Sequence, residues 1–396
     1  MVSANRDAGD IDVGENLTWG LKEGTLTIRG TGKMRDMRGS IWGEYRESIL
    51  RVVIEEGVTH VGAYFFYYMP NLTSASIADS VTTIGDRAFF ASRALKNVTL
   101  SKNVIEIGEY AFGSCNALNT ILLPNTLTAI GNAAFFESGL TSVVIPASVK
   151  SIGNVAFGVI QSLISITVDK SNKYFKSVDG VLFFRNGTHL MQYPAGNRST
   201  SYIVPDGVEV IEGHAFRDCY SLRNIVISES VSLIQIRAFE HCSALTSVFY
   251  QGSYCVTDAD SLWRVFAISP VRNVCVPPAY SSHTFCYLNV TNTSTCNAFQ
   301  KLFNTCNKGS FVDDQIAPQK WKNVTDWEER TDGCVEYACS VDSGLVSRSM
   351  CNAPRKCIEG KCISEWDWDY LSGSSLVNVM TSMLLLVLAT VINLSL

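Results

Sequence analysis

The sequence predicts a solenoid, an elongated stack of repeats in which each repeat adds one short parallel β-strand. The first observation is that the stretch VTTIGDRAF at 81–89 returns in related form along the chain. The second is its spacing, because the phenylalanines that end the copies lie 23, 23, 23, 22, 59 and 23 residues apart. A period of this length is typical of stacked repeats. These residues are Phe66, Phe89, Phe112, Phe135, Phe157, Phe216 and Phe239.

The other half of each copy predicts a short strand with one buried face. A leucine is followed three and five residues later by apolar residues, as in Leu95, Val98 and Leu100. This alternation puts the apolar side chains on one face of a strand. A proline or a polar residue then ends the strand in a turn. One repeat cannot bury its own apolar side chains, whereas stacked neighbours form a continuous core.

A glycine follows the buried Val or Ile in most copies. We expect this position to need either a positive φ or a close approach of neighbouring backbone. Glu212 and Gln235 occupy it in two later copies, so a positive φ is not required in every copy. The glycines are Gly62, Gly85, Gly108, Gly131 and Gly153.

The combined pattern, L-x-x-h-x-h-P-x-x-V-x-x-I-G-x-x-A-F with h apolar, resembles the BspA-type leucine-rich repeats of bacterial and protist surface proteins. The segment NLTW at 16–19, the Gly- and Thr-rich stretch 24–34 and Trp42 are similar to the N-terminal segment of that family. The resemblance extends over roughly residues 14–280. It implies a leucine-rich-repeat fold and contact with host matrix or neighbouring cells, and it implies no chemistry.

The pattern divides the chain into four parts. Residues 1–45 form an N-terminal capping segment, and 46–290 form the repeat array. Residues 291–365 form a small Cys-rich module, and 366–396 form a hydrophobic membrane-anchor segment. The array is interrupted by an insertion at 169–201, where Asn-Gly between two apolar runs predicts a β-hairpin. This hairpin either projects as a contact loop or packs on the flank of the solenoid.

The cysteines predict an oxidising compartment. Three of the 13 lie in the repeats and ten lie between Cys255 and Cys362, a density that suits an exported protein. No signal peptide opens the sequence, and we interpret its start as incomplete. Asn-x-Ser/Thr sequons support export as a glycoprotein. The candidate glycosylation sites are Asn71, Asn97, Asn186, Asn197, Asn289 and Asn323.

Two sets of cysteines are disulfide candidates. Cys219 and Cys242 fall at the same position of neighbouring repeats, where parallel strands lie ~4.8 Å apart, within the ~4.4–6.8 Å that a disulfide spans. The alternative is that these two, like Cys115, are small buried side chains in a stacked position. The second set contains no CxxC pair, and no histidine follows His283, which favours disulfides over zinc. Its members are Cys334, Cys339, Cys351, Cys357 and Cys362.

The chain closes with an apolar tail that predicts contact with a membrane. Small residues at 372–375 precede about 21 moderately apolar residues at 376–396. This arrangement resembles a GPI-attachment signal, although the polar spacer is short. A transmembrane segment is the alternative.

No motif in the sequence predicts catalysis. The five histidines fall in no catalytic order, and no metal or cofactor motif is present. The net charge of −5 provides no basic stripe for nucleic acid. We therefore expect no enzyme, no cofactor, no metal site and no nucleic-acid partner.

The solvent side of the predicted strand row is the candidate binding face. Its residues point opposite to the buried ones, and several are apolar, although β-propensity alone could select them. We expect a cell-surface protein that binds an extracellular protein or glycan, with a self-associating coat or a tail-anchored intracellular scaffold as alternatives. The candidate residues are Leu122, Val144, Thr167, Ile203, Val226 and Phe249.

Overall fold

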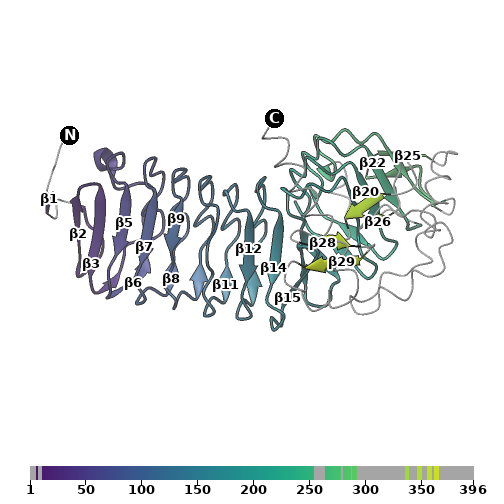
Figure 1. Cartoon of the computed structure of the whole chain (residues 1–396). Helices are drawn as coiled ribbons and strands as arrows, with labels where there is room; N and C mark the ends of the chain where they lie inside the picture. The colour runs from purple at the N-terminus through teal and green to yellow at the C-terminus, as the bar shows by residue number, and fades with distance from the viewer. Residues whose placement is uncertain are drawn as a thin grey trace, which may run out of the picture. The chain divides into compact units, whose positions relative to one another are not determined.

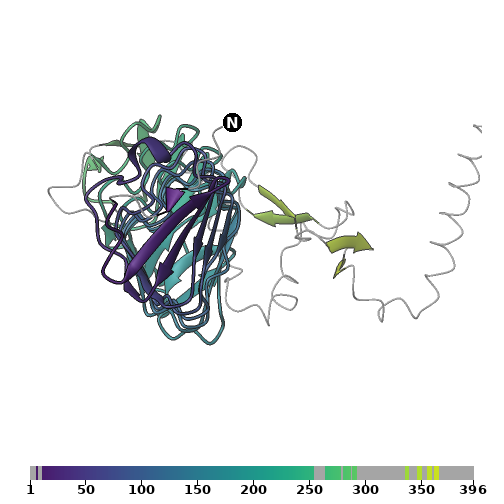
Figure 2. The same cartoon turned by 90° about the vertical axis from the view of Figure 1, so that its left-hand side faces the viewer.

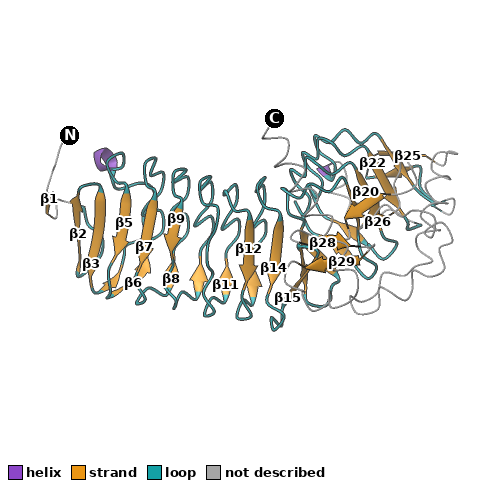
Figure 3. Ribbon diagram, viewed as in Figure 1, coloured by secondary structure: helices purple, strands orange, loops and turns teal. Residues whose placement is uncertain are grey.

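The chain forms two compact units, Met1–Cys296 and Asn297–Leu396. The computed structural model describes residues 6–7, 11–253, 264–277, 280–286, 288–291, 335–338, 346–349, 355–358 and 361–364. The tail at 366–396 and most of the Cys-rich segment therefore lie outside the described residues. Where the structure describes the chain, its regular elements are nearly all strands (Figure 3).

The first unit is the predicted solenoid. Most turns of the stack, or rungs, contribute one strand to a first row, and partner residues are typically 23 positions apart, as in Ser74 and Asn97. Strands of successive rungs pair in parallel, and viewed along the stack the successive rungs superpose (Figures 1 and 2). The first row comprises β5 (Arg51–Ile54), β7 (Ser74–Ile77), β9 (Asn97–Thr99), β12 (Ser142–Ile145), β14 (Ser165–Val168), β18 (Ser201–Ile203), β20 (Asn224–Ile227), β22 (Ser247–Tyr250), β23 (Asn273–Cys275) and β25 (Leu288–Thr291), with β24 (Thr284–Phe285) antiparallel to β25.

A second row of shorter strands runs along another face of the stack, and in Figure 1 β6, β8 and β11 lie at its lower edge. These strands carry the V-x-x-I part of the repeat, so their apolar side chains enter the same core. The second row comprises β6 (Val58–Val61), β8 (Thr83–Ile84), β10 (Glu106–Ile107), β11 (Ala129–Ile130), β13 (Ser151–Ile152), β17 (His189–Gln192), β19 (Val210–Ile211) and β21 (Leu233–Ile234).

The N-terminal segment covers the first rung. β1 (Arg6–Asp7), β2 (Leu17–Lys22) and β3 (Thr25–Gly30) pair antiparallel, and β3 then pairs in parallel with β5. β4 (Gly32–Lys33) joins the second row at β6, and the 3₁₀ helix η1 (Gly43–Tyr45) follows. Trp42 is fully buried, its ring stacks on Phe66, and its Nε1–H donates to the carbonyl of Phe65 at 2.8 Å. An end that would expose apolar side chains is thereby closed.

The repeat phenylalanines form a stack of rings through the core. Neighbouring rings lie 5.0–5.6 Å apart and within 19° of parallel from Phe66 to Phe157. Each ring is at most 2% exposed. Because the rings from Phe66 to Phe135 each have a neighbouring ring on both faces, this ladder buries the largest side chains of the repeat.

Close packing of neighbouring backbones explains the repeat glycine. A Cβ on Gly131 would lie 2.6 Å from the nitrogen of Glu109 and 2.6 Å from the carbonyl carbon of Gly108, closer than such atoms can approach. The φ of this glycine is not positive, so of the two expected requirements close approach is the one found. Positive φ values fall instead two residues before and after the phenylalanine, as at Arg87 and Ala91 beside Phe89.

The insertion differs from both expected arrangements, because it is built into the core. β15 (Phe175–Val178), β16 (Val181–Phe184) and β17 form an antiparallel sheet, and β17 also pairs in parallel with β19 as a second-row strand. Tyr193 then takes the phenylalanine position, stacking on Phe216 at 5.1 Å. The alternate side chains of β16 enter two different cores, Leu182 the N-terminal one and Phe183 the C-terminal one. An apolar strand buried on both faces cannot project into solvent.

In the second unit the described residues form two hairpins. β26 (Val335–Ala338) pairs with β27 (Val346–Ser349), and β28 (Arg355–Ile358) pairs with β29 (Lys361–Ser364). Cys357 and Cys362 are directly opposed in the register of the second hairpin. The other disulfide candidates of this segment, Cys334, Cys339 and Cys351, lie outside the described residues.

Candidate binding surfaces

The predicted binding face is exposed over the middle of the first row. The side chain of Leu122 is 91% exposed and that of Val144 is 60% exposed, and Thr167 beside Val144 is also exposed. The rung of Leu122 forms no strand pairing with β9 or β12, which interrupts the first row there. Two neighbouring rungs therefore present large aliphatic side chains to solvent, and a solvated surface gains nothing from them.

The C-terminal part of the predicted face is not available, which corrects the prediction for Val226 and Phe249. These residues are only 7% and 3% exposed, and Ile203 is half-buried. In the register Val226 lies between Ile203 and Phe249, while Phe249 lies between Val226 and Cys275. Both side chains are thus flanked by residues of the neighbouring strands, and Cys275 is itself disulfide-bonded.

A second surface, missed by the sequence analysis, lies beside the ring ladder on the first four rungs. We call it the aromatic edge, and its rings contact one another from rung to rung. The guanidinium of Arg87 lies between two of them, 5.5 Å from the Tyr64 ring and 4.9 Å from the Tyr110 ring, and donates to Glu109 at 2.7 Å. Tyr and Arg are the residues enriched in protein interfaces. The aromatic edge consists of Tyr64, Tyr67, Tyr68, Phe90, Tyr110 and Phe136.

A signal for the aromatic edge was present in the sequence. The repeat phenylalanine is followed directly by a second aromatic residue at Tyr67, Phe90 and Phe136. When the first of two consecutive aromatic residues fills the core position of a short turn, the second cannot enter it as well. The second residue is therefore expected at the surface. The three residues are half-buried, whereas Phe89 and Phe135 are fully buried.

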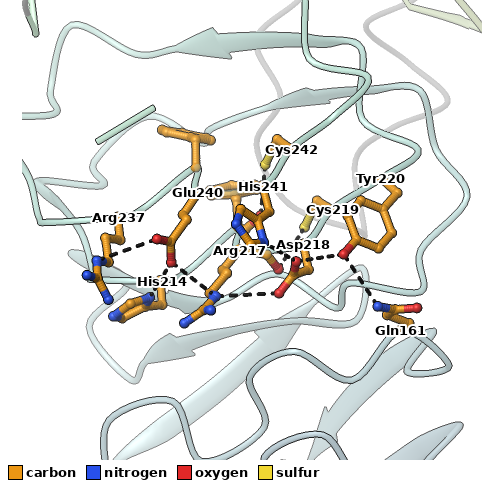
Figure 4. Close-up of polar contacts among 12 residues, drawn as sticks. Gln161, His214, Arg217, Asp218, Cys219, Tyr220, Arg237, Glu240, His241 and Cys242 are labelled. Carbon is orange, nitrogen blue, oxygen red and sulfur yellow. Dashed lines mark hydrogen bonds and ion pairs between the residues drawn. The ribbon is translucent and has the colours of Figure 1, made fainter. Parts of the chain in front are cut away.

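A charged cluster occupies the same edge on the rungs after the insertion (Figure 4). Asp218 accepts from the hydroxyl of Tyr220 at 2.8 Å and lies 3.2 Å from Nδ1 of His241. Arg217 lies 3.1 Å from the carboxylate of Glu240, and the two acidic side chains are only 3% and 9% exposed. Burial, together with the bond to Asp218, raises the pKa of Tyr220 to about 12.

The cluster links rungs and does not form a catalytic triad. The hydroxyl of Tyr220 contacts the carboxylate of Asp218 and not the imidazole of His241, so that imidazole is not placed to activate it. Gln161, from the rung before the insertion, donates to the same hydroxyl at 3.4 Å. Each buried carboxylate has a cationic or hydrogen-bonding partner, as buried charges require.

Acid is expected to weaken the first unit through His214. Burial, followed by the charge of Arg217, lowers the pKa of His214 below its ordinary value of 6.5. The charge of Glu240 opposes this shift. Of two smaller effects, Arg237 lowers the pKa further and Asp218 raises it. As the pH falls, His214 therefore takes up a proton in the unfolded chain before it does so in the folded chain. The stability is complete above pH 6.5 and is lost as the pH falls through the lowered pKa of the folded state.

Thermal unfolding between about pH 8 and pH 5 would measure this loss. The wild-type protein should lose Tm more steeply than His214→Gln, because glutamine carries no titratable proton. Equal slopes for the two proteins would contradict the assignment.

Within the repeats the structure contains free thiols, which corrects the predicted disulfide between Cys219 and Cys242. The thiol of Cys242 points to the carbonyl of Phe216 at 3.0 Å, and that of Cys115 points to Phe89 at 3.2 Å. The hydroxyls of Ser92 and Ser269 donate in the same way to the carbonyl of the ladder phenylalanine in the previous rung, Phe66 and Phe239 respectively. The three cysteines are thus the small buried side chains of the alternative interpretation, and those of Cys115 and Cys242 satisfy a buried carbonyl. Burial raises the pKa of Cys115 and Cys219.

Three of the candidate glycosylation sites lie at the surface of the first unit. Asn71, Asn97 and Asn186 are exposed, and Asn97 opens β9 on the first row. Asn197 is half-buried, and its Oδ1 accepts from the backbone of Ser199. Asn289 lies in β25, and Asn323 falls outside the described residues.

The described residues contain no group of three or more His, Cys, Asp or Glu side chains that could hold a metal ion. They also contain no helix of the length and apolarity that a membrane crossing needs.

The strand rows, the ring ladder and the repeat glycines define a leucine-rich-repeat solenoid. The model of the BspA type leucine rich repeat region matches in six copies over residues 45–179 and 195–312, more than half of the chain. The chain belongs to this family. Its repeats are those of a scaffold that presents extended faces.

One solved structure has a similar fold, and two others are similar in part. A leucine-rich repeat protein from Eubacterium ventriosum is 25% identical, with 74% of this chain and 86% of that chain covered at a TM-score of 0.60. The pneumococcal vaccine antigen PcpA is 19% identical over 72% and 86%, at 0.47. A leucine rich cell surface protein from Faecalibacterium prausnitzii is 22% identical over 74% and 97%, at 0.48. The comparison with curated proteins gives no match.

Proposed function

We propose that the protein is a non-enzymatic, cell-surface adhesion scaffold that binds a protein of the host matrix or of a neighbouring cell. The observation that carries the proposal is the exposure of Leu122 and Val144 on adjacent rungs of the first row. An apolar patch at the centre of a contact is the part that contributes most of the binding free energy. The aromatic edge, where Arg87 lies between two tyrosine rings, adds residue types that are enriched in protein interfaces.

Display outside the cell is supported by three observations. Cys275 is disulfide-bonded, which favours an oxidising compartment. Asn71, Asn97 and Asn186 have exposed side chains that can accept glycans. The apolar tail at 376–396, as a GPI signal or a transmembrane segment, would hold the chain at the membrane.

Replacing Leu122 and Val144 together by lysine is expected to reduce adhesion by at least about tenfold, because two charges would enter an apolar contact. The measurement is attachment of cells displaying the full chain to a reconstituted extracellular-matrix layer. Protease added to the intact cells should remove the repeat unit, which establishes display. The fold should not change, since both side chains are solvated.

Ile105→Lys is the matched control, because Ile105 is 44% exposed but precedes β10 in the second row. It should adhere like the wild type. Unchanged adhesion of the folded double variant would refute the proposed face. If the wild-type chain instead self-associates with concentration and the double variant is monomeric, the coat alternative replaces adhesion. Protection of the repeat unit from protease would favour the intracellular scaffold.

A further inference from the structure

A cavity lies where the insertion interrupts the ring ladder. Phe157 stacks on Phe135 at 5.5 Å, and the next ring of the ladder, Tyr193, belongs to the other core. Between the two cores is a cavity of about 90 Å³ that the ring of Phe157 helps to line. One ring of the ladder therefore borders open space where the other rings meet a neighbour.

The walls of this junction cavity combine apolar side chains with two hydrogen-bond acceptors. Phe157, Leu182, Phe184 and Met191 provide the apolar surface. Asn154, Gln192 and Glu212 provide polar side chains of the lining, and the last two place acceptor oxygens there. A cavity that combines apolar surface with a few convergent polar groups is typical of a ligand site.

Gln192 is oriented so that its amide oxygen is the group left for a ligand. Only 4% of this residue is exposed. Its Nε2 donates to the carbonyls of Tyr193 at 3.0 Å and Ala215 at 3.2 Å. Because both amide hydrogens are used by the backbone, the side chain can offer a ligand an acceptor and not a donor.

Glu212 adds a negative charge at a position that has no side chain in the early repeats. It occupies the place of the repeat glycine, which Gly131 and Gly153 fill before the insertion. One carboxylate oxygen accepts from Nδ1 of His189 at 2.7 Å. The second oxygen remains to accept from a ligand.

We propose that the junction cavity binds an alkylammonium group, a primary ammonium on a short aliphatic stem. The ammonium donates to Glu212 and to the amide oxygen of Gln192, and the stem packs on Leu182 and Met191. The ring of Phe157 adds attraction for a cation. Anions are repelled by the carboxylate, and a neutral apolar molecule would leave both acceptors unpaired. A free alkylamine and a lysine side chain of a bound protein share this chemistry. The site is independent of the proposed adhesion face.

The test is a titration of the protein labelled at its methionine methyl groups, followed by NMR at Met191. The probe is n-butylammonium chloride, and 1-butanol is the neutral control of similar shape. Met191→Leu identifies the signal. We expect a saturable shift with n-butylammonium and at least about tenfold weaker binding of 1-butanol. Nα-acetyl-lysine N-methylamide extends the series, and its binding would show that the cavity accepts a side chain and not only a free amine.

Glu212→Gln should weaken the binding of n-butylammonium by at least about tenfold, since the negative charge of the carboxylate is lost. The variant is expected to fold, because Gln235 occupies the same repeat position in the next rung. Glu209→Gln is the control, because Glu209 is exposed and directly precedes β19. This variant should bind n-butylammonium like the wild type. Equal binding of 1-butanol, undiminished binding by Glu212→Gln, or no saturable shift at Met191 would each overturn the proposal.

Discussion

Replacing Asn172 with alanine is expected to lower the free energy of unfolding by about 3–6 kcal/mol, because a buried polar group left unpaired costs about 1–3 kcal/mol. Asn172 is 1% exposed and uses its whole amide. Its Nδ2 donates to the carbonyls of Pro146 and Val149, each at 2.9 Å. Its Oδ1 accepts from the backbone N–H groups of Tyr174 and Phe175, each at 2.8 Å. The side chain thus fastens the start of the insertion to the preceding rung.

Urea unfolding measures the effect of this change. Asn172→Asp should lose less than the alanine variant, because it keeps the acceptor for the two N–H groups, although it cannot donate to the carbonyls. Asn186→Ala is the control, since Asn186 is exposed and bonds only within its own turn, to Thr188. A loss below about 1 kcal/mol for Asn172→Ala would show that water or a local shift replaces these bonds.

Gly131→Ala is expected to lower the free energy of unfolding by at least about 2 kcal/mol, because overpacking in a close-packed core costs about 1–3 kcal/mol or more. The added Cβ would meet the backbone of Gly108 and Glu109 at 2.6 Å. Backbone cannot rotate away as a side chain can, so the whole preceding rung must shift. That rung is itself held by the rung before it, and the strain spreads along the array.

Gly39→Ala is the matched control for this change. A Cβ on Gly39 meets no heavy atom within 4 Å, so its effect on thermal unfolding should be small. A Gly131→Ala protein that unfolds at the wild-type temperature would show that the rungs can separate locally. Such separation would also explain why Glu212 and Gln235 are tolerated at the equivalent position after the insertion.

The sequence alone was sufficient for the repeat, the first strand row and the family, because each depends on a local pattern repeated many times, whereas the second row of strands was not predicted. The spacing from Phe66 to Phe157 predicted the stack of repeats, and Leu-x-x-h-x-h predicted strands such as β7 and β12. An atypical residue in one copy does not hide a pattern that the other copies share. The repeat glycine was also recognised, although the choice between positive φ and close approach needed the neighbouring rung.

Other features were decided only by contacts between residues far apart in the chain. Val226 and Val144 share one repeat position, but only Val144 is exposed, because burial depends on what covers the face. Cys219 and Cys242 lie at the same position of neighbouring rungs, yet the direction of the Cys242 thiol toward the carbonyl of Phe216 follows from the packing. Spacing along the chain determines distance between backbones and not the direction of a side chain.

The insertion shows the same division most clearly. Its hairpin, strands and Asn-Gly turn were evident from the sequence, since turn chemistry is local. That β16 would lie between two cores, with Leu182 on one side and Phe183 on the other, could not be read from the alternation. A single interrupted repeat has no second copy to compare with. The sequence by itself therefore determined the repeating architecture, whereas the tertiary structure alone decided how the interruption is filled and where it leaves a cavity.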